Sequence, residues 1–121
     1  EIPYDPYNAT QTVKELMKDG FELTQFRQGY LTMSPAAKAF EAAVLDKKIA
    51  HGNNPVMKWM IGCTDVQSDP AGNIKPVKPD RGKTDKRIDG VITAVMAYSR
   101  SVSKEDTMSV YETRGIAFVE A

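Results

Sequence analysis

Two aspartates stand where a carboxylate can do chemistry. Asp5 follows a short expected strand, Ile2–Tyr4, which the pair Asp5-Pro6 ends because proline fixes its own φ and biases the preceding residue away from helix. A carboxylate at a strand end can point into a cleft, although an aspartate before proline can equally do no more than form a turn. Asp89 falls in the first turn of an expected helix, where the dipole favours negative charge. Dipole compensation alone is the alternative for Asp89.

A basic stretch leads into Asp89. Between positions 75 and 87 six basic residues stand against two acidic ones, an excess of four positive charges, whereas the whole chain balances 16 basic with 16 acidic residues. Such a stretch suits a phosphodiester backbone brought to a metal ion, since the basic side chains hold phosphates and the acid holds the cation. We expect Lys83, Lys86 and Arg87 to contact DNA. A solvated charged loop is the alternative.

For three further side chains the sequence favours structural roles over chemical ones. His51 is the single histidine and has no partner at ligand spacing, which argues against zinc and favours a loop histidine bonded to backbone over a ligand or general base. Cys63 is the single cysteine, so it forms no internal disulfide; we expect a small, half-buried apolar residue in a reducing cytoplasm. Trp59 is expected in the core rather than as a stacking platform.

The chain opens with a predicted strand–helix–strand unit. A helix is expected from Asn8 or Thr10 to Lys18, stopped by Gly20, and a strand over Phe21–Phe26. Two strands joined through a helix of this length normally lie parallel.

The remaining elements complete an α/β chain. Ser34-Pro35 predicts a helix start, with an apolar stripe reaching Ile49. The segment 56–61 is either a short helix or a turn leading to a strand, and residues 66–77 read as a β-hairpin around an Asp-Pro and Gly-Asn turn. Apolar residues at helical spacing predict an amphipathic helix over 88–102, and we expect residues 104–121 to form a partly ordered, flexible tail.

The size of the chain fits one domain or a piece of one. It has 121 residues, no apolar run near the roughly 20 that a membrane helix needs, and no signal peptide. It opens on Glu1 rather than methionine, as the interior of a longer protein would.

Nine short blocks of the sequence, taken in order, resemble the C-terminal nuclease part of bacteriophage terminase large subunits. These proteins are the DNA-packaging motor and nuclease. Each block is weak alone, and the specificity comes from the ordered series. The blocks are Tyr4-Asp5-Pro6, Phe26-Arg27-Gln28-Gly29, Met33-Ser34-Pro35, Lys47-Lys48-Ile49-Ala50-His51, Asn54-Pro55-Val56-Met57-Lys58-Trp59, Asp69-Pro70-Ala71-Gly72-Asn73, Lys86-Arg87-Ile88-Asp89-Gly90-Val91, Met96-Ala97 and Ser109-Val110-Tyr111-Glu112.

The resemblance implies that residues 1–121 are the C-terminal part of a ribonuclease H-like nuclease domain that cleaves double-stranded DNA during genome packaging in the bacterial cytoplasm. It makes Asp5 and Asp89 the second and last acids of a site for two Mg²⁺ or Mn²⁺ ions. The family's first acid and its ATPase domain lie upstream of Glu1, so we expect the chain alone to cut poorly. In the intact protein the implied partners are the terminase small subunit and the portal, with no membrane.

Two other functions stay open, a non-catalytic DNA-binding or packaging-motor assembly module and an inert prophage remnant. In the ribonuclease H-like fold that the resemblance implies, the strand before Asp5 normally pairs with the strand of the first acid. We therefore also expect a homodimer that covers the open edge of the strand Ile2–Tyr4.

Overall fold

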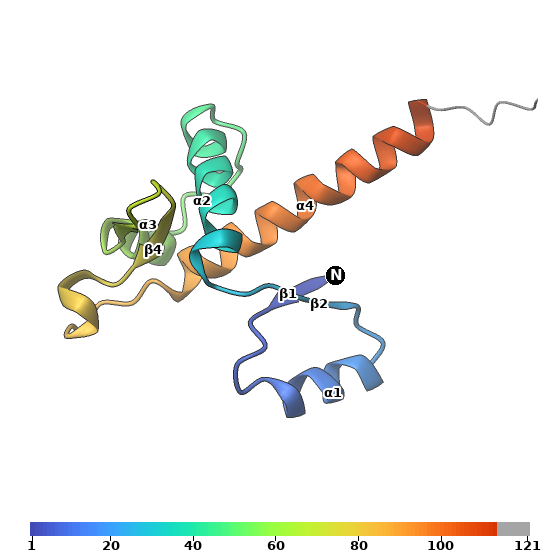
Figure 1. The fold of residues 1–121 in the computed structure, drawn as a ribbon, viewed down its shortest axis with the longest axis horizontal. Helices are drawn as coiled ribbons and strands as arrows, with labels where there is room; N and C mark the ends of the chain where they lie inside the picture. The colour runs from blue at the N-terminus through green and yellow to red at the C-terminus, as the bar shows by residue number, and fades with distance from the viewer. Residues whose placement is uncertain (114–121) are drawn as a thin grey trace, which may run out of the picture.

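The chain begins with the expected strand–helix–strand unit. A computed structural model describes the backbone of residues 1–113 and the side chains of residues 1–80 and 83–103. Strand β1 (Ile2–Tyr4), helix α1 (Thr10–Lys18) and strand β2 (Leu23–Gln25) follow one another (Figure 1), and the strands pair in parallel with Ile2 opposite Leu23. The predictions for this unit, including the parallel pairing, are confirmed.

Helix α2 (Tyr30–Leu45) starts before the predicted Ser34-Pro35 signal, so that prediction is wrong. Met33 N already donates to Gly29 O at 2.9 Å, which closes a helical turn upstream of Ser34. Ser34 is 2% exposed, and its Oγ accepts a hydrogen bond from Ile74 N at 3.0 Å. The serine therefore joins α2 to the hairpin instead of capping a helix. Pro35 lies inside α2, where it removes one intrahelical hydrogen bond.

The end of α2 also differs from the prediction, because the helix stops at Leu45 rather than continuing to Ile49. Lys47 adopts φ +57°, and Lys48 N donates to Ala43 O at 2.9 Å while Lys47 N donates to Val44 O at 3.1 Å. These two bonds form a Schellman motif, a helix end usually built on glycine. Because a lysine and not a glycine occupies the left-handed position, the sequence did not indicate that the helix ends here.

Helix α3 (Pro55–Gly62) and the hairpin of β3 (Asp65–Ser68) and β4 (Ile74–Val77) follow. Asn54 Oδ1 accepts hydrogen bonds from Val56 N at 2.9 Å and Met57 N at 3.1 Å, so segment 56–61 is the helix of the two alternatives. The strands pair antiparallel, which confirms the hairpin.

A 3₁₀ turn, η1 (Pro79–Gly82), leads to helix α4 (Asp89–Thr113), which is longer than the predicted 88–102. The predicted flexible tail, residues 104–121, lies outside the residues whose side chains are described, and residues 114–121 lie outside the described chain altogether. It stays a prediction.

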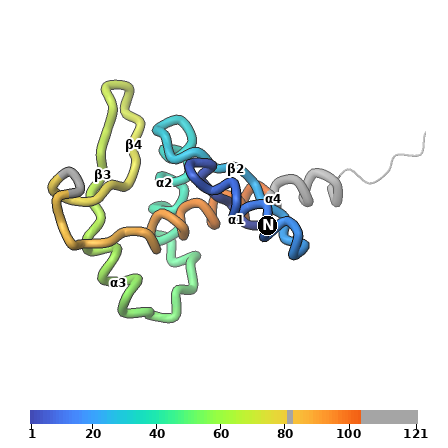
Figure 2. Tube along the Cα trace, turned by 90° about the horizontal axis from the view of Figure 1, so that it is seen from below, coloured from blue at the N-terminus to red at the C-terminus, as the bar shows by residue number. Residues whose placement is uncertain are grey.

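The core lies where α2 crosses α4. Its buried members come from the end of β2, from α2 and from α4: Phe26, Met33, Ala36, Val91, Val95 and Met96. Figures 1 and 2 both place α3 and the hairpin beside the N-terminal part of α4, with β1 and β2 further along that helix. None of the helices in the described part of the chain is long and apolar enough to cross a membrane. The α/β class is confirmed.

Candidate acidic site and its basic flank

Asp5 forms the turn that its sequence position predicts. Its Oδ1 accepts a hydrogen bond from Tyr7 N at 2.8 Å, across Pro6, in an Asx-type turn. The residue is half-buried, and its second carboxylate oxygen makes no hydrogen bond or ion pair with a described residue. One oxygen of Asp5 therefore fixes the turn, and the other has no partner among the described residues.

Asp89 begins α4 with an exposed side chain on an anchored backbone. Its carbonyl accepts from Thr93 Oγ1 at 3.0 Å, while its carboxylate has no hydrogen bond or ion pair among the described residues. Ile88, immediately before it, is 4% exposed, so the chain enters the core just ahead of the acid. The predicted position in the first helical turn is confirmed.

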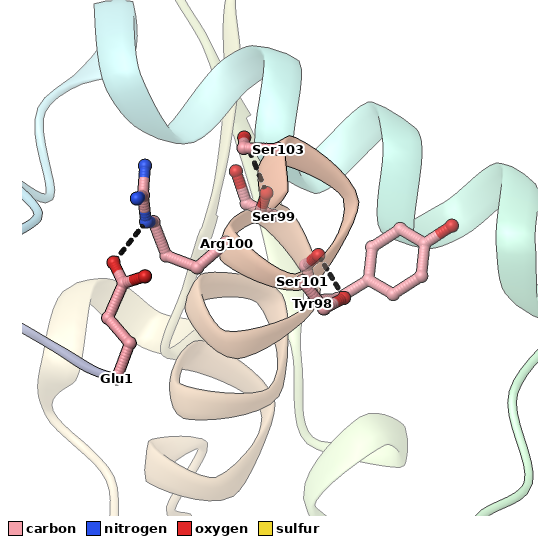
Figure 3. Close-up of polar contacts among 6 residues, drawn as sticks. All are labelled: Glu1, Tyr98, Ser99, Arg100, Ser101 and Ser103. Atoms are coloured by element: carbon pink, nitrogen blue, oxygen red, sulfur yellow. Dashed lines mark hydrogen bonds and ion pairs between the residues drawn. The ribbon is translucent and has the colours of Figure 1, made fainter. Parts of the chain in front are cut away.

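Strand β1 runs back along α4, with its two ends at different levels of the helix. At the start of the strand, Glu1 Oε1 accepts from Arg100 Nε at 2.6 Å (Figure 3). At its end, Tyr4 O accepts from Phe26 N at 2.7 Å, and Phe26 packs in the core with Met96. The chain therefore runs along β1 toward the N-terminal half of α4, and Asp5 is the residue directly after the strand.

Along the axis of α4, roughly two helical turns separate Met96 from Asp89. Met96 lies seven residues after Asp89, about 10 Å along a helix axis. Within the described residues, no group of three or more His, Cys, Asp or Glu is gathered to hold a metal ion. The described chain thus offers two separate carboxylates.

The basic flank is exposed at the three residues expected to contact DNA. Lys83, Lys86 and Arg87 are exposed, and none forms an ion pair with a described residue. Arg87 Nη1 donates to Lys86 O at 3.1 Å and to Thr84 O at 3.4 Å, which folds the guanidinium against its own loop. Lys75, counted in the same basic stretch, lies instead over the Tyr30 ring at 4.7 Å and is half-buried. Three exposed cations without an ion-pair partner among the described residues therefore precede Asp89 closely in the chain.

The structural roles expected for His51 and Cys63 are confirmed, while the one for Trp59 is wrong. His51 Nδ1 accepts from Asn53 N at 3.0 Å, and Cys63 is 6% exposed. Trp59 is 49% exposed, because α3 is a short helix that turns Met57 and Met60 toward the core and leaves the tryptophan outside.

Comparison with known proteins assigns the chain to a family. Residues 1–105 match the family described as terminase large subunit, endonuclease domain. The chain is 35% identical over 119 residues to Protein YmfN of Escherichia coli (strain K12), a match that covers 96% of the chain and 26% of that protein. It is 35% identical over 98 residues to the terminase large subunit of Enterobacteria phage HK97, covering 79% of the chain and 19% of the phage protein.

The structural comparison agrees with the sequence matches. The crystal structure of the HK97 bacteriophage large terminase aligns with a TM-score of 0.66 and 31% sequence identity, over 78% of this chain and 19% of that one. The chain spans about a quarter or less of the proteins it matches. The expected fold, part of a ribonuclease H-like nuclease domain, is confirmed. This chain belongs to the terminase large subunit endonuclease domain family.

Proposed function

We propose that this chain is part of a metal-dependent endonuclease that cuts double-stranded DNA during phage genome packaging. The observation that carries the proposal is family membership over residues 1–105. The free carboxylate of Asp89 beside the exposed cations of the basic flank supports it. In the whole protein we propose the terminase small subunit and the portal as partners, in the cytoplasm of a bacterial host.

The donor atoms of the two aspartates fit magnesium or manganese. Both ions prefer oxygen ligands, and magnesium commonly keeps several waters while one or two protein carboxylates and substrate phosphates complete its shell. Asp5 and Asp89 would hold the metal through the oxygens that have no partner in the described chain. When bound, a metal pair stabilises both the attacking and the leaving oxygen of a phosphodiester. The exposed Lys83 and Lys86 would orient the DNA backbone by holding its phosphates.

Manganese binding tests the metal site. We expect calorimetric titration of the chain with Mn²⁺ to show binding that Asp89→Asn weakens at least about tenfold, or ~1.4 kcal/mol. Asp85→Asn is the matched control, since it removes the same charge from an exposed residue four positions away. The proposal fails if the unaltered chain does not bind Mn²⁺, or if the two variants bind it equally.

Cleavage provides the second readout. Supercoiled plasmid incubated with the chain in Mg²⁺ is expected to be nicked slowly, because no group of three or more metal-ligating side chains is gathered among the described residues. Rapid cleavage that Asp89→Ala abolishes would show that this chain holds a sufficient ligand set. Cleavage unaffected by Asp89→Ala would contradict the assignment of that acid.

A non-catalytic DNA-binding role is the second candidate, favoured by the three exposed cations of the basic flank. Replacing Lys83, Lys86 and Arg87 by alanine should flatten the salt dependence of DNA binding, by about one unit of slope per lost phosphate contact. A control triple variant removes equal charge from other exposed sites, Lys14, Lys18 and Lys48. DNA binding that needs the flank, in a chain that binds no Mn²⁺, would favour this candidate over the nuclease.

We also propose that the chain associates with a second copy through the β1–β2 unit. Among the described residues β1 pairs only with β2, so the small sheet has open edges, and the nearby Phe21 is 51% exposed. A two-fold dimer would cover these groups. Sedimentation at increasing concentration measures it; a monomer at all concentrations with a sharp cooperative melt would contradict it.

A further inference from the structure

The first turn of α4 is held by a side chain from another helix. Gly90 is the second residue of α4, and the amide groups of a first helical turn have no acceptor within their own helix. Gly90 N donates instead to Met60 Sδ of α3 at 3.2 Å. A thioether sulfur is a weak acceptor, so this contact adds little to stability, but it gives the Gly90 amide a partner on another helix.

The close approach depends on the absence of a side chain at position 90. A Cβ built on Gly90 would lie 2.6 Å from Met60 Sδ, nearer than real contacts of this kind. The cavity of about 500 Å³ beside them, lined by His51, Asn54 and Met57 among others, leaves the thioether room to move away. An alanine at position 90 would thus displace the sulfur and break the hydrogen bond without overfilling the core.

Asp89 lies between two anchored neighbours. On one side the Ile88 side chain is 4% exposed, and on the other the Gly90 amide is bound to Met60. Helix α3, which carries Met60, is itself fixed at its start by the Asn54 cap and along its length by core packing of Met57 and Met60. The backbone around Asp89 is therefore defined by α3 as well as by its own helix.

We propose that Met60 is a positioning residue, which holds the backbone at Gly90 so that the neighbouring Asp89 carboxylate is presented to the metal ion. The inference rests on the proposed nuclease function, in which Asp89 is a metal ligand. Met60 itself has no contact with the metal in this role. A purely structural methionine would affect stability alone, whereas a positioning residue also alters the geometry and metal affinity of Asp89.

A pair of matched variants separates these roles. Met60→Leu removes the sulfur acceptor and keeps the side-chain volume. Met57→Leu makes the same change on the same helix, at a methionine that lines the same cavity but whose sulfur is not the acceptor of the Gly90 amide. Volume-conserving changes of this kind cost less than about 1.5 kcal/mol in stability, so both variants are expected to fold. Thermal melts of the two provide the stability baseline.

Nuclear magnetic resonance tests the positioning without any metal. Met60→Leu and Gly90→Ala should shift the Asp89 carboxyl carbon resonance, and Met60→Leu should also shift the Gly90 amide. Met57→Leu keeps the hydrogen bond from Gly90 N to Met60 Sδ and should shift both resonances less than Met60→Leu does. An unchanged Asp89 resonance in Met60→Leu would overturn the proposal, whatever the metal affinity of that variant.

Manganese titration of the same variants then tests the consequence for the metal. We expect Met60→Leu and Gly90→Ala to weaken Mn²⁺ binding about two- to fivefold, the range of one weak hydrogen bond, and Met57→Leu to leave it unchanged. If Met60→Leu binds Mn²⁺ as tightly as the unaltered chain while Asp89→Asn binds weakly, Asp89 is a ligand and the positioning role is wrong. If the unaltered chain binds no Mn²⁺, the proposed function fails and the positioning role falls with it.

Discussion

The two candidate acids are carried by parts of the molecule that are anchored very differently. Asp5 belongs to the β1–α1–β2 unit, whose helix α1 contributes no buried residue and whose sheet has two three-residue strands. Asp89 begins α4, which supplies Val91, Val95 and Met96 to the buried core. The position of Asp5 therefore depends on a thinly packed unit, whereas the position of Asp89 depends on a helix of the buried core. The geometry between them depends on the joint of the two parts.

That joint consists of a few identifiable contacts. Phe26, at the end of β2, is the member of the N-terminal unit that enters the buried core. Strand β1 adds the ion pair between Glu1 and Arg100. Loss of the ion pair would change the position of Asp5 relative to Asp89 while leaving the core residues in place. The difference teaches that stability and site geometry can be altered separately in this chain.

The largest contrast in stability is expected between two methionines, one in each part. Met33→Ala empties a core position that is 1% exposed, and should lower the free energy of unfolding by about 2–5 kcal/mol. Met17→Ala changes an α1 side chain that is 51% exposed, and should cost less than about 0.5 kcal/mol. Urea unfolding of both variants measures the contrast. Equal losses would show that α1 is buried in solution, as in a dimer.

A smaller effect is expected at the cap of α3, on the core side of the comparison. Asn54→Ala removes the acceptor for Val56 N and Met57 N, and should cost about 0.5–2 kcal/mol. Lys58→Ala, an exposed change in the same helix, is the control and should be nearly neutral. Chemical denaturation compares the two. A neutral Asn54→Ala would mean that α3 is held by Met57 and Met60 alone.

The sequence predicted best where local signals and tertiary structure agree. The strand–helix–strand unit follows from Gly20, which supplies a φ of +88° at the end of α1, and from the helical connection, which is long enough for the two strands to lie parallel. The hairpin follows from its Asp-Pro and Gly-Asn turn, in which Asp69 Oδ1 accepts from Asn73 N at 2.8 Å. Both elements are determined by bonds between neighbours in the chain.

Prediction failed where a distant partner decides the role of a residue. Ser34 has the sequence of a helix cap, but its hydroxyl binds Ile74 N, forty residues away. Lys47 ends α2 in a conformation typical of glycine. The contact of Met60 with Gly90 joins two helices through a sulfur atom, which no spacing rule indicates. Asp5 and Asp89 are candidates from their places at a strand end and a helix start; their role as metal ligands comes from the resemblance to a family and stays a prediction.

The hairpin turn should show a modest dependence on pH. Hydrogen bonds from the Asn73 side chain, and from the backbone of Asn73 and Ala71, lower the pKa of Asp69 below its ordinary value of 3.8. A lowered pKa means that the stabilisation is present above the ordinary value and is lost as the pH falls through the folded value. Unfolding between about pH 2 and pH 6 should therefore show a stability advantage over Asp69→Asn that shrinks in acid. Asp65→Asn, in the same hairpin, is the control; an advantage independent of pH would contradict this account.

The smallest effect on overall stability is expected at the Glu1–Arg100 ion pair of the joint. The loss of this pair should affect hydrogen exchange mainly in the β1–β2 unit. The Glu1 carboxylate accepts from Arg100 Nε, and this bond raises the pKa of the arginine, which therefore stays protonated at any ordinary pH. In this pair the Arg100 side chain is 34% exposed and the Glu1 side chain 5%, so water screens it only in part, and Arg100→Ala should cost about 1 kcal/mol, the upper end for exposed pairs, with a small shift of the melting curve. Hydrogen exchange should nevertheless speed up at Phe26 N, which donates to Tyr4 O in β1, while amides of α2 stay protected. Added salt should mimic the substitution. Equal acceleration in α2 would mean that both parts open as one unit, and the contrast between them would then be wrong.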